Sequence, residues 1–210
     1  EAGEPLLTEA GALEAALPGY EDLEPLAELL VDSFIPLLDP QEVPEVVRPA
    51  VELWNWGVAA VEKRTARAAL NQNLGYTMLS PSLSKPRGRQ FEGHALGLML
   101  VPRGSRGAPG TPASPVAFCE LCLIPSDGRQ ADDLSELLAM LSYEALAADA
   151  EPYLLNFCVS KDLRRQGVGS ALLRIAEDVV RNVWGSERLF LHAKGGEAAA
   201  RLYRQSGYDV

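Results

Sequence analysis

A pair of glycines behind two arginines is the feature of this sequence best suited to do chemistry. Gly167 and Gly169 follow Arg164 and Arg165, between an apolar run that ends at Val159 and an amphipathic segment. Glycine lets the backbone approach a ligand closely, and the first turn of a helix leaves its N–H groups free. Such a geometry binds phosphate, and the arginines add positive charge. We therefore expect a phosphate-binding loop at a strand-to-helix junction.

Two common nucleotide-binding loops do not fit this segment. The chain has no G-x-x-x-x-G-K-[ST] motif, which argues against hydrolysis of nucleoside triphosphates. A dinucleotide-binding fingerprint needs a third glycine at position 172, where this chain has leucine. A helix start with capping glycines and surface arginines, without any ligand, is the remaining structural alternative.

The elements that must position this loop follow from the apolar periodicity of the chain. Helical spacing predicts helices over 24–35, 43–70, 132–147, 169–184 and 198–205, the last with Gly207 as its C-cap. Apolar runs predict strands over 94–101, 114–124, 153–159 and 188–193, and a short edge strand over 5–8. This order of elements predicts a mixed sheet of the α/β class.

The chain divides into two parts of different composition. Residues 1–20 are expected to be an acidic N-terminal extension, and residues 21–210 the main domain. Glycine, proline and serine dominate residues 102–115, which predicts a loop insertion with nothing apolar to bury. The additional helix over 132–147 has three open interpretations, namely a lid, a partner-binding face or ordinary packing.

Composition and charge exclude several classes of protein. The 210 residues have a formal net charge of −10, and residues 1–47 contain twelve acidic and no basic side chains. The negative charge argues against general nucleic-acid binding, and no apolar run is long enough to span a membrane. Three cysteines do not make a disulfide framework and fit a reducing compartment. The acidic segment is either an ordinary solvated surface, or it attracts cationic substrates or a basic partner.

The phosphate loop and the C-terminal segment together resemble a known family. Residues 164–169 fit the signature [R/Q]-x-x-G-x-[G/A], and residues 199–208 resemble the ending A-x-x-L-Y-x-x-x-G-[F/Y]. Both are motifs of GNAT acetyltransferases, and residues 27–34 and 153–156 resemble segments of their plastid members. The resemblance implies the GNAT fold, a mixed central sheet flanked by helices. The chain ends at Val210, where one or two strands normally complete that sheet, so we expect them to be missing here.

The same resemblance implies acetyl transfer from acetyl-CoA to an amine. In the family, a strand edge binds the pantetheine arm, the loop binds the pyrophosphate, and a tyrosine donates a proton to the leaving thiolate. Tyr203 matches that tyrosine and is the expected general acid. Gly196 stands where the family commonly has an asparagine. The expected cofactor-binding residues are Phe157, Cys158, Val159, Arg164, Arg165, Gln166, Gly167, Val168, Gly169, Ser170, Gly196 and Tyr203.

An acetylated amine must lose a proton, and two residues are candidates for the base. Glu120 lies within a predicted strand among apolar neighbours, where a charge is costly unless it is used or paired. The alternative is that Glu120 points to the solvated face of that strand. His192 is the second candidate, although a histidine satisfied within the core is the preferred interpretation.

The cysteine pair Cys119 and Cys122 invites a metal or redox interpretation that its setting does not favour. On a strand, residues three apart point to opposite faces, and the chain has no second pair. We expect no metal site and three buried thiols, the third being Cys158.

Three functions are open from the sequence. The first is an N-acetyltransferase acting on protein N-terminal α-amines, lysine side chains or both. The second is acetylation of a small amine such as a polyamine, and the third is a non-catalytic GNAT-fold subunit of a larger plastid assembly. Resemblance alone implies the plastid stroma, and otherwise the cytoplasm. A protein partner would contact the acidic N-terminal segment or the 132–147 helix.

Overall fold

The computed structural model describes residues 6–8, 11–79, 81–85, 95–106, 108, 110–125, 150–193 and 197–209. The helix expected over 132–147 lies outside these residues. In chain order the elements are β1 (Leu6–Thr8), β2 (Gly11–Ala16), η1 (Tyr20–Asp22), α1 (Leu23–Phe34), η2 (Glu45–Val47), α2 (Arg48–Leu79), β3 (Leu96–Pro102), β4 (Ala117–Pro125), β5 (Ala150–Val159), η4 (Lys161–Leu163), α5 (Val168–Asp178), the π-helical turn η5 (Val179–Val183), β6 (Phe190–Leu191) and α6 (Glu197–Gln205).

One six-stranded sheet organises the described part of the chain. The strands lie in the order β1-β2-β3-β4-β5-β6, and each neighbouring pair from β1 to β5 is antiparallel. β6 pairs with β5 in parallel, as expected for two strands joined by a helical crossover through α5. The predicted α/β class with a mixed sheet is therefore confirmed.

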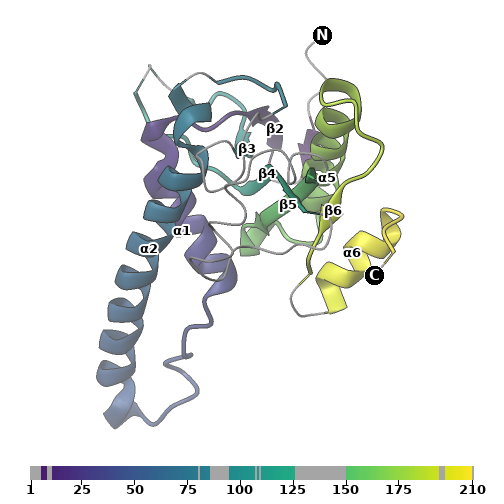
Figure 1. Cartoon of the computed structure of the whole chain (residues 1–210). Coiled ribbons are helices and arrows are strands. Elements are labelled where there is room, and N and C mark those ends of the chain that lie inside the picture. Colours follow the sequence, from purple (N-terminus) through teal and green to yellow (C-terminus); the bar gives the residue numbers. More distant parts are fainter. Residues whose placement is uncertain are drawn as a thin grey trace, which may run out of the picture.

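Helices cover both faces of the sheet (Figure 1). α1 and α2 pack on one face, and α5 packs on the other. The alternation of side chains along β4 serves both layers, because Phe118 and Cys122 enter the first core while Cys119 and Leu121 enter the second. The central strands are accordingly apolar on both faces, which explains why they appear in the sequence as continuous apolar runs.

α2 differs from its predicted extent and packing. It runs nine residues beyond the predicted end, and its buried side chains are Leu70, Leu74 and Met78. The first half extends past the sheet, with the α1–α2 connection alongside (Figure 1). Trp54 and Trp56 on this half are 65% and 72% exposed. The apolar spacing predicted the helix, but the residues that anchor it lie in its last third.

The N-terminal strands lie in the segment that the sequence assigned to an acidic extension. β1 is the expected edge strand, whereas β2 was not predicted. Glycine and alanine make up most of β2, so it has little of the β-branched and aromatic character that indicates a strand. Its residues pair with β3 over Leu13–Ala16, and Leu13 is buried in the core.

The expectation that residues 102–115 bury nothing is wrong. Ala113 is 3% exposed, and its backbone N–H donates to Oδ1 of the fully buried Asp22 at 2.8 Å. Arg106 donates to the other oxygen of Asp22 at 3.1 Å and also to the carbonyl of Leu17. A buried carboxylate at the start of α1 thus anchors this connection. The absence of large apolar residues gave no sign of such a polar anchor.

At the C-terminal end, β6 is shorter than its prediction over 188–193. Gly207 follows α6 with φ of 89°, the left-handed conformation expected of a C-cap. Among the described residues no helix is long and apolar enough to cross a membrane.

Candidate active site

The glycine-arginine loop begins where β5 ends and turns directly into α5. Arg165 and Gly167 have φ of 63° and 81°, so the chain passes twice through the left-handed region. Ala171 makes the first backbone bond of the helix, to the carbonyl of Gly167 at 3.0 Å. The N–H groups of residues 168–170 therefore have no partner within the helix and point out of its positive end. The structure thus has the strand-to-helix turn and the free helix N-terminus that the sequence predicted, and phosphate binding by this loop stays a prediction.

Side chains of the loop fix its own backbone. Nε of Arg164 donates to the carbonyl of Val159 at 3.0 Å, and Nε2 of Gln166 donates to the carbonyl of Asp162 at 2.9 Å. The guanidinium of Arg164 is held near the end of β5, while Arg165 is exposed. The loop is thus ordered by internal bonds, and its charge remains available to an anion.

The last residues of β5, next to this loop, contain a bulge opposite β4 and are not paired with β6. The register places Asn156 and Phe157 together opposite Cys119 of β4, and Asn156 adopts φ of 50°. β6 pairs only with Tyr153 and Leu154. The edge of β5 from residue 155 to Val159 therefore has no pairing with β6, and its backbone groups face a cleft. The predicted pantetheine-binding residues Phe157, Cys158 and Val159 lie on this stretch.

The cleft is a cavity of about 770 Å³ between α1, β5, α5 and α6. Gly169 lies close to three other lining residues, because a Cβ there would stand 3.5 Å from Leu202, 3.6 Å from Val159 and 3.8 Å from Phe157. Most of the predicted cofactor residues meet here. Its lining residues are Ser33, Phe34, Phe157, Cys158, Val159, Arg164, Arg165, Gly167, Gly169, Ser170, Ala198, Ala199, Arg201, Leu202, Tyr203 and Gln205.

The contributions of α1 and of most of α6 to the lining of the cleft were not predicted. Ser33 and Phe34 come from α1, more than a hundred residues before the loop, and no local pattern marks them. Gln166 and Val168, which were predicted to bind the cofactor, do not line the cavity with their side chains; Val168 is buried. Gly196 lies outside the described residues.

Tyr203 projects from α6 into the cleft and is 6% exposed. Its ring makes edge contacts with Phe157 and Tyr208, at centroid distances of 6.1 and 5.8 Å. Burial raises the pKa of its phenol to about 12, so the hydroxyl stays protonated at neutral pH. A protonated phenol fixed by two aromatic neighbours can act as a proton donor.

Replacing Arg165 should change stability and anion binding in opposite directions. Arg165 adopts a left-handed conformation that costs a non-glycine residue about 1–2 kcal/mol, and Arg165→Gly removes this strain. The gain exceeds the roughly 0.5–1 kcal/mol by which glycine raises the conformational entropy lost on folding. We expect a free energy of unfolding up to about 1 kcal/mol higher. The affinity for a phosphate ligand should fall roughly three- to tenfold with the lost charge.

Two matched variants separate these effects. Arg165→Gln removes the charge but keeps the strained φ, so it should lose affinity without gaining stability. Arg174→Gln removes a charge from the exposed side of α5 and should change neither quantity. Urea unfolding measures the free energy of unfolding, and calorimetric titration measures the affinity for phosphate. Equal stability of Arg165→Gly and Arg165→Gln would contradict backbone strain at position 165.

Glu120, the expected base, is fully buried on β4. The alternative that it faces solvent is therefore wrong. Nδ2 of Asn73 donates to its Oε2 at 3.0 Å, and Nδ2 of Asn156 donates to its Oε1 at 2.8 Å. Burial raises the pKa of Glu120 and the two amides lower it. Asn156 was missed, although an asparagine inside an apolar strand is a signal of this kind.

His192, the second candidate, is exposed rather than a core residue, which corrects the preferred interpretation. Its Nδ1 lies 2.8 Å from the hydroxyl of Tyr153. It does not line the cleft that contains Tyr203.

All three cysteines are buried thiols, as predicted. Cys119 and Cys122 enter the cores on opposite faces of the sheet, so they do not form one site. Burial raises the pKa of Cys158 to about 12.

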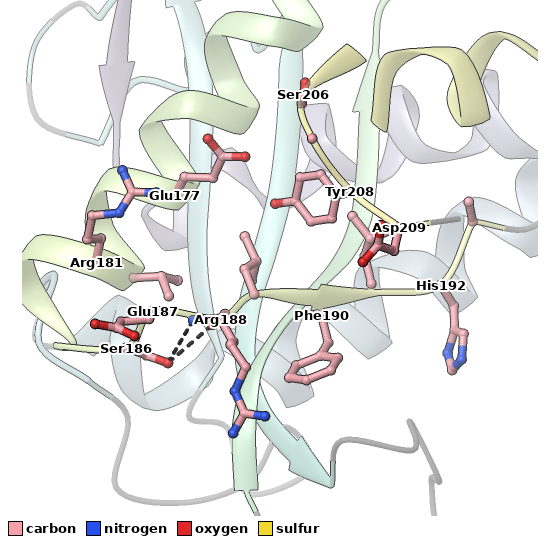
Figure 2. A pocket seen from close by; sticks show the side chains of 15 residues that line it. Glu177, Arg181, Ser186, Glu187, Arg188, Phe190, His192, Ser206, Tyr208 and Asp209 are labelled. Carbon is pink, nitrogen blue, oxygen red and sulfur yellow. Dashed lines mark hydrogen bonds between the residues drawn. The ribbon is translucent and has the colours of Figure 1, made fainter. Parts of the chain in front are cut away.

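A second cavity of about 720 Å³ lies along β6, between the helical residues 177–181 and the residues that follow α6 (Figure 2). Figure 2 shows Glu177 and Arg181 on one wall and Tyr208 and Asp209 near the strand. Ser186 at the start of the strand bonds the backbone of Arg188. None of the predicted cofactor-binding residues lines this cavity.

Comparison with known proteins finds a family resemblance for the C-terminal part of the chain. Residues 112–208 match the model described as "Acetyltransferase (GNAT) family". This range contains β4, β5, the glycine-arginine loop, α5 and α6, and thus three of the four walls of the cleft. Over this range the chain resembles the GNAT acetyltransferase family. The resemblance stated from the sequence motifs is therefore confirmed.

Curated relatives match this chain over short segments. One is 37% identical over 60 residues to GCN5-related N-acetyltransferase 5, chloroplastic, of Arabidopsis thaliana, covering 28% of this chain and 19% of that protein. Another is 36% identical over 78 residues to GCN5-related N-acetyltransferase 7, chloroplastic, of the same plant, covering 36% and 28%. The matches thus span a fifth to a quarter of the length of these relatives.

A solved structure matches more of the chain at lower similarity. It is a GCN5-related N-acetyltransferase from Ralstonia eutropha JMP134, 18% identical, with a TM-score of 0.48 and coverage of 94% of this chain and 93% of that chain.

Proposed function

We propose that this protein transfers the acetyl group of acetyl-CoA to a primary amine. The observation that supports this most is the junction of the anion-binding loop with the unpaired edge of β5, beside Tyr203 in one cleft. The loop suits a pyrophosphate, and a free strand edge suits an extended arm with amide groups. The resemblance of residues 112–208 to the GNAT family agrees with this chemistry.

The charge, the free backbone groups and the open space of the cleft suit the parts of acetyl-CoA. The free N–H groups of residues 168–170 with Arg165 would hold the pyrophosphate, and Gly169 leaves room for its approach. The backbone of Phe157–Val159 would hydrogen-bond the pantetheine arm. When bound, acetyl-CoA supplies an activated acyl group and a thiolate leaving group.

The side chains of the site would move the two protons of the reaction. The N–C bond forms as the C–S bond breaks. The phenol of Tyr203 would give its proton to the departing thiolate. Glu120, which lines the neighbouring cavity rather than the cleft itself, would take the proton of the amine. Its pKa, raised by burial, makes it a stronger base than an exposed glutamate. The phenol is reprotonated from solvent after product release.

Protein N-terminal α-amines, lysine side chains or both are the proposed acceptors, and the plastid stroma the proposed location. Two relatives that match are named chloroplastic N-acetyltransferases. The acidic character of residues 1–47 favours the approach of cationic amines.

A product analysis with several acceptors tests this function. The protein is incubated with acetyl-CoA and, separately, a peptide with a free N-terminus, an N-blocked lysine peptide and an aliphatic diamine. Thiol release and product mass are measured. We expect acetylated product with at least one peptide. Binding of acetyl-CoA without thiol release above the blank for every acceptor would contradict catalysis and favour a non-catalytic GNAT subunit.

A further inference from the structure

A separate cavity of about 280 Å³ lies between α1, α2 and the strands β4 and β5. Its walls are mainly aliphatic, with Glu120 as a fully buried carboxylate and Glu62 half-buried on α2. Phe34 lines this cavity and also the cleft that contains Tyr203. The residues that matter to its chemistry are Leu30, Val31, Leu70, Glu62, Glu120 and Asn156.

The hydrogen bonds around Glu120 suit its charged form, against the burial that raises its pKa. Both of its oxygens accept hydrogen bonds from side-chain amides, one from Asn73 on α2 and one from Asn156 at the bulge of β5. A protonated carboxyl would carry an O–H that needs an acceptor, and an amide NH₂ group cannot accept. The pair of donors therefore favours the charged form of Glu120 over the neutral one.

This anion has no cationic partner in the described part of the chain. Of the basic side chains of α2 that follow Glu62, Lys63 pairs with Glu24 and Glu28 and Arg67 pairs with Glu24, while Arg64 is exposed. A buried carboxylate without a counter-charge is costly, and two neutral amides compensate only part of that cost. A cation that enters the cavity would complete the site.

We propose that this cavity binds the ammonium group of an unbranched primary alkylamine. Its methylene stem would pack against Leu30, Val31 and Leu70, with Glu62 as the specificity-determining residue at the exposed end. A terminal α-ammonium fits less well, since the peptide group next to it would meet aliphatic walls without hydrogen-bonding partners. The assignment rests on the proposed function in one respect, because it makes this amine the acetyl acceptor.

The first test measures binding without turnover. The full chain is titrated calorimetrically with n-butylammonium, with n-butanol as the uncharged probe and tert-butylammonium as the branched one. We expect n-butylammonium to bind at least about tenfold more tightly than either, as for a charge-assisted contact. Equal affinity for butanol and butylammonium would overturn the proposal.

Two variants show whether the carboxylates are responsible. Glu62→Gln lies at the exposed end and should fold normally, and we expect it to weaken butylammonium binding roughly threefold or more. Glu120→Gln should abolish the preference for the ammonium over butanol. Glu52→Gln, an exposed position on the same helix, is the matched control and should not change it. Wild-type ammonium affinity in both Glu62→Gln and Glu120→Gln would overturn the site.

Turnover then distinguishes the source of the amine and the two proposals. Acetylation of an N-blocked lysine peptide over free n-butylamine identifies a protein side chain as the acceptor, and the reverse identifies a small amine. Ammonium binding without acetyl transfer would contradict the proposed function but not the pocket. Acetyl transfer with an unchanged KM for the amine in Glu62→Gln and Glu120→Gln would contradict the pocket but not the function.

Discussion

Replacing Tyr203 by phenylalanine is expected to lower kcat about a hundredfold or more, the usual contribution of a general acid. The variant loses only the hydroxyl, because the ring contacts with Phe157 and Tyr208 do not need it. Acetyl-CoA affinity should therefore stay within about threefold of wild type, so the loss falls on kcat rather than on binding. Stopped-flow measurement of thiol release, with a separate binding titration, separates the two quantities.

Tyr208→Phe is the matched control, since its ring packs against Tyr203 but does not line the cleft. It should retain most of the wild-type rate. Because the pKa of Tyr203 is raised to about 12, we also expect no loss of rate from its ionisation up to about pH 10. A Tyr203→Phe variant with the wild-type kcat would remove the proton-donor role.

Replacing Gly169 by leucine is expected to weaken acetyl-CoA binding roughly 10–100-fold. A Cβ at this position already stands in contact distance of Leu202, Val159 and Phe157, so the remaining side-chain atoms must displace them or enter the cleft. Such overpacking costs about 1–3 kcal/mol. Where the leucine side chain occupies the place of the ligand, this cost is subtracted from the free energy of acetyl-CoA binding. Calorimetric titration with acetyl-CoA measures the loss.

Gly169→Ala is the comparison, because its φ is not left-handed and a lone Cβ meets only ordinary contacts at 3.5–3.8 Å. We expect binding within about threefold of wild type and a free energy of unfolding within about 1 kcal/mol of it. If leucine bound acetyl-CoA as well as alanine does, Gly169 would not adjoin the ligand.

The phosphate loop could be predicted because its determinants are local. Arg165, Gly167 and the first turn of α5 are neighbours in sequence, and their conformations follow from residue type. Ser33 and Phe34 could not be assigned to the same cleft, since only the packing of α1 against β5 brings them there. Predicting that contact would require the topology of the whole sheet.

Burial was the least predictable property of single polar residues. Glu120 and His192 were both predicted to lie in strands, yet Glu120 is fully buried and His192 is exposed. The difference arises because Asn73 and Asn156 satisfy Glu120, whereas β6 ends before His192. Likewise the apolar spacing did not show that the first half of α2 extends past the sheet (Figure 1), where Trp54 is 65% exposed.

Thermal unfolding of the full chain at increasing acetyl-CoA concentration tests most directly whether this cleft is an acetyl-CoA site. A ligand that binds only the folded state should stabilise it by about 2.7 kcal/mol at a hundred times its Kd. We expect a dose-dependent rise in Tm, displaced to higher concentration in Arg165→Gln and in Gly169→Leu. No rise at millimolar acetyl-CoA, or the same rise in all three proteins, would contradict the site.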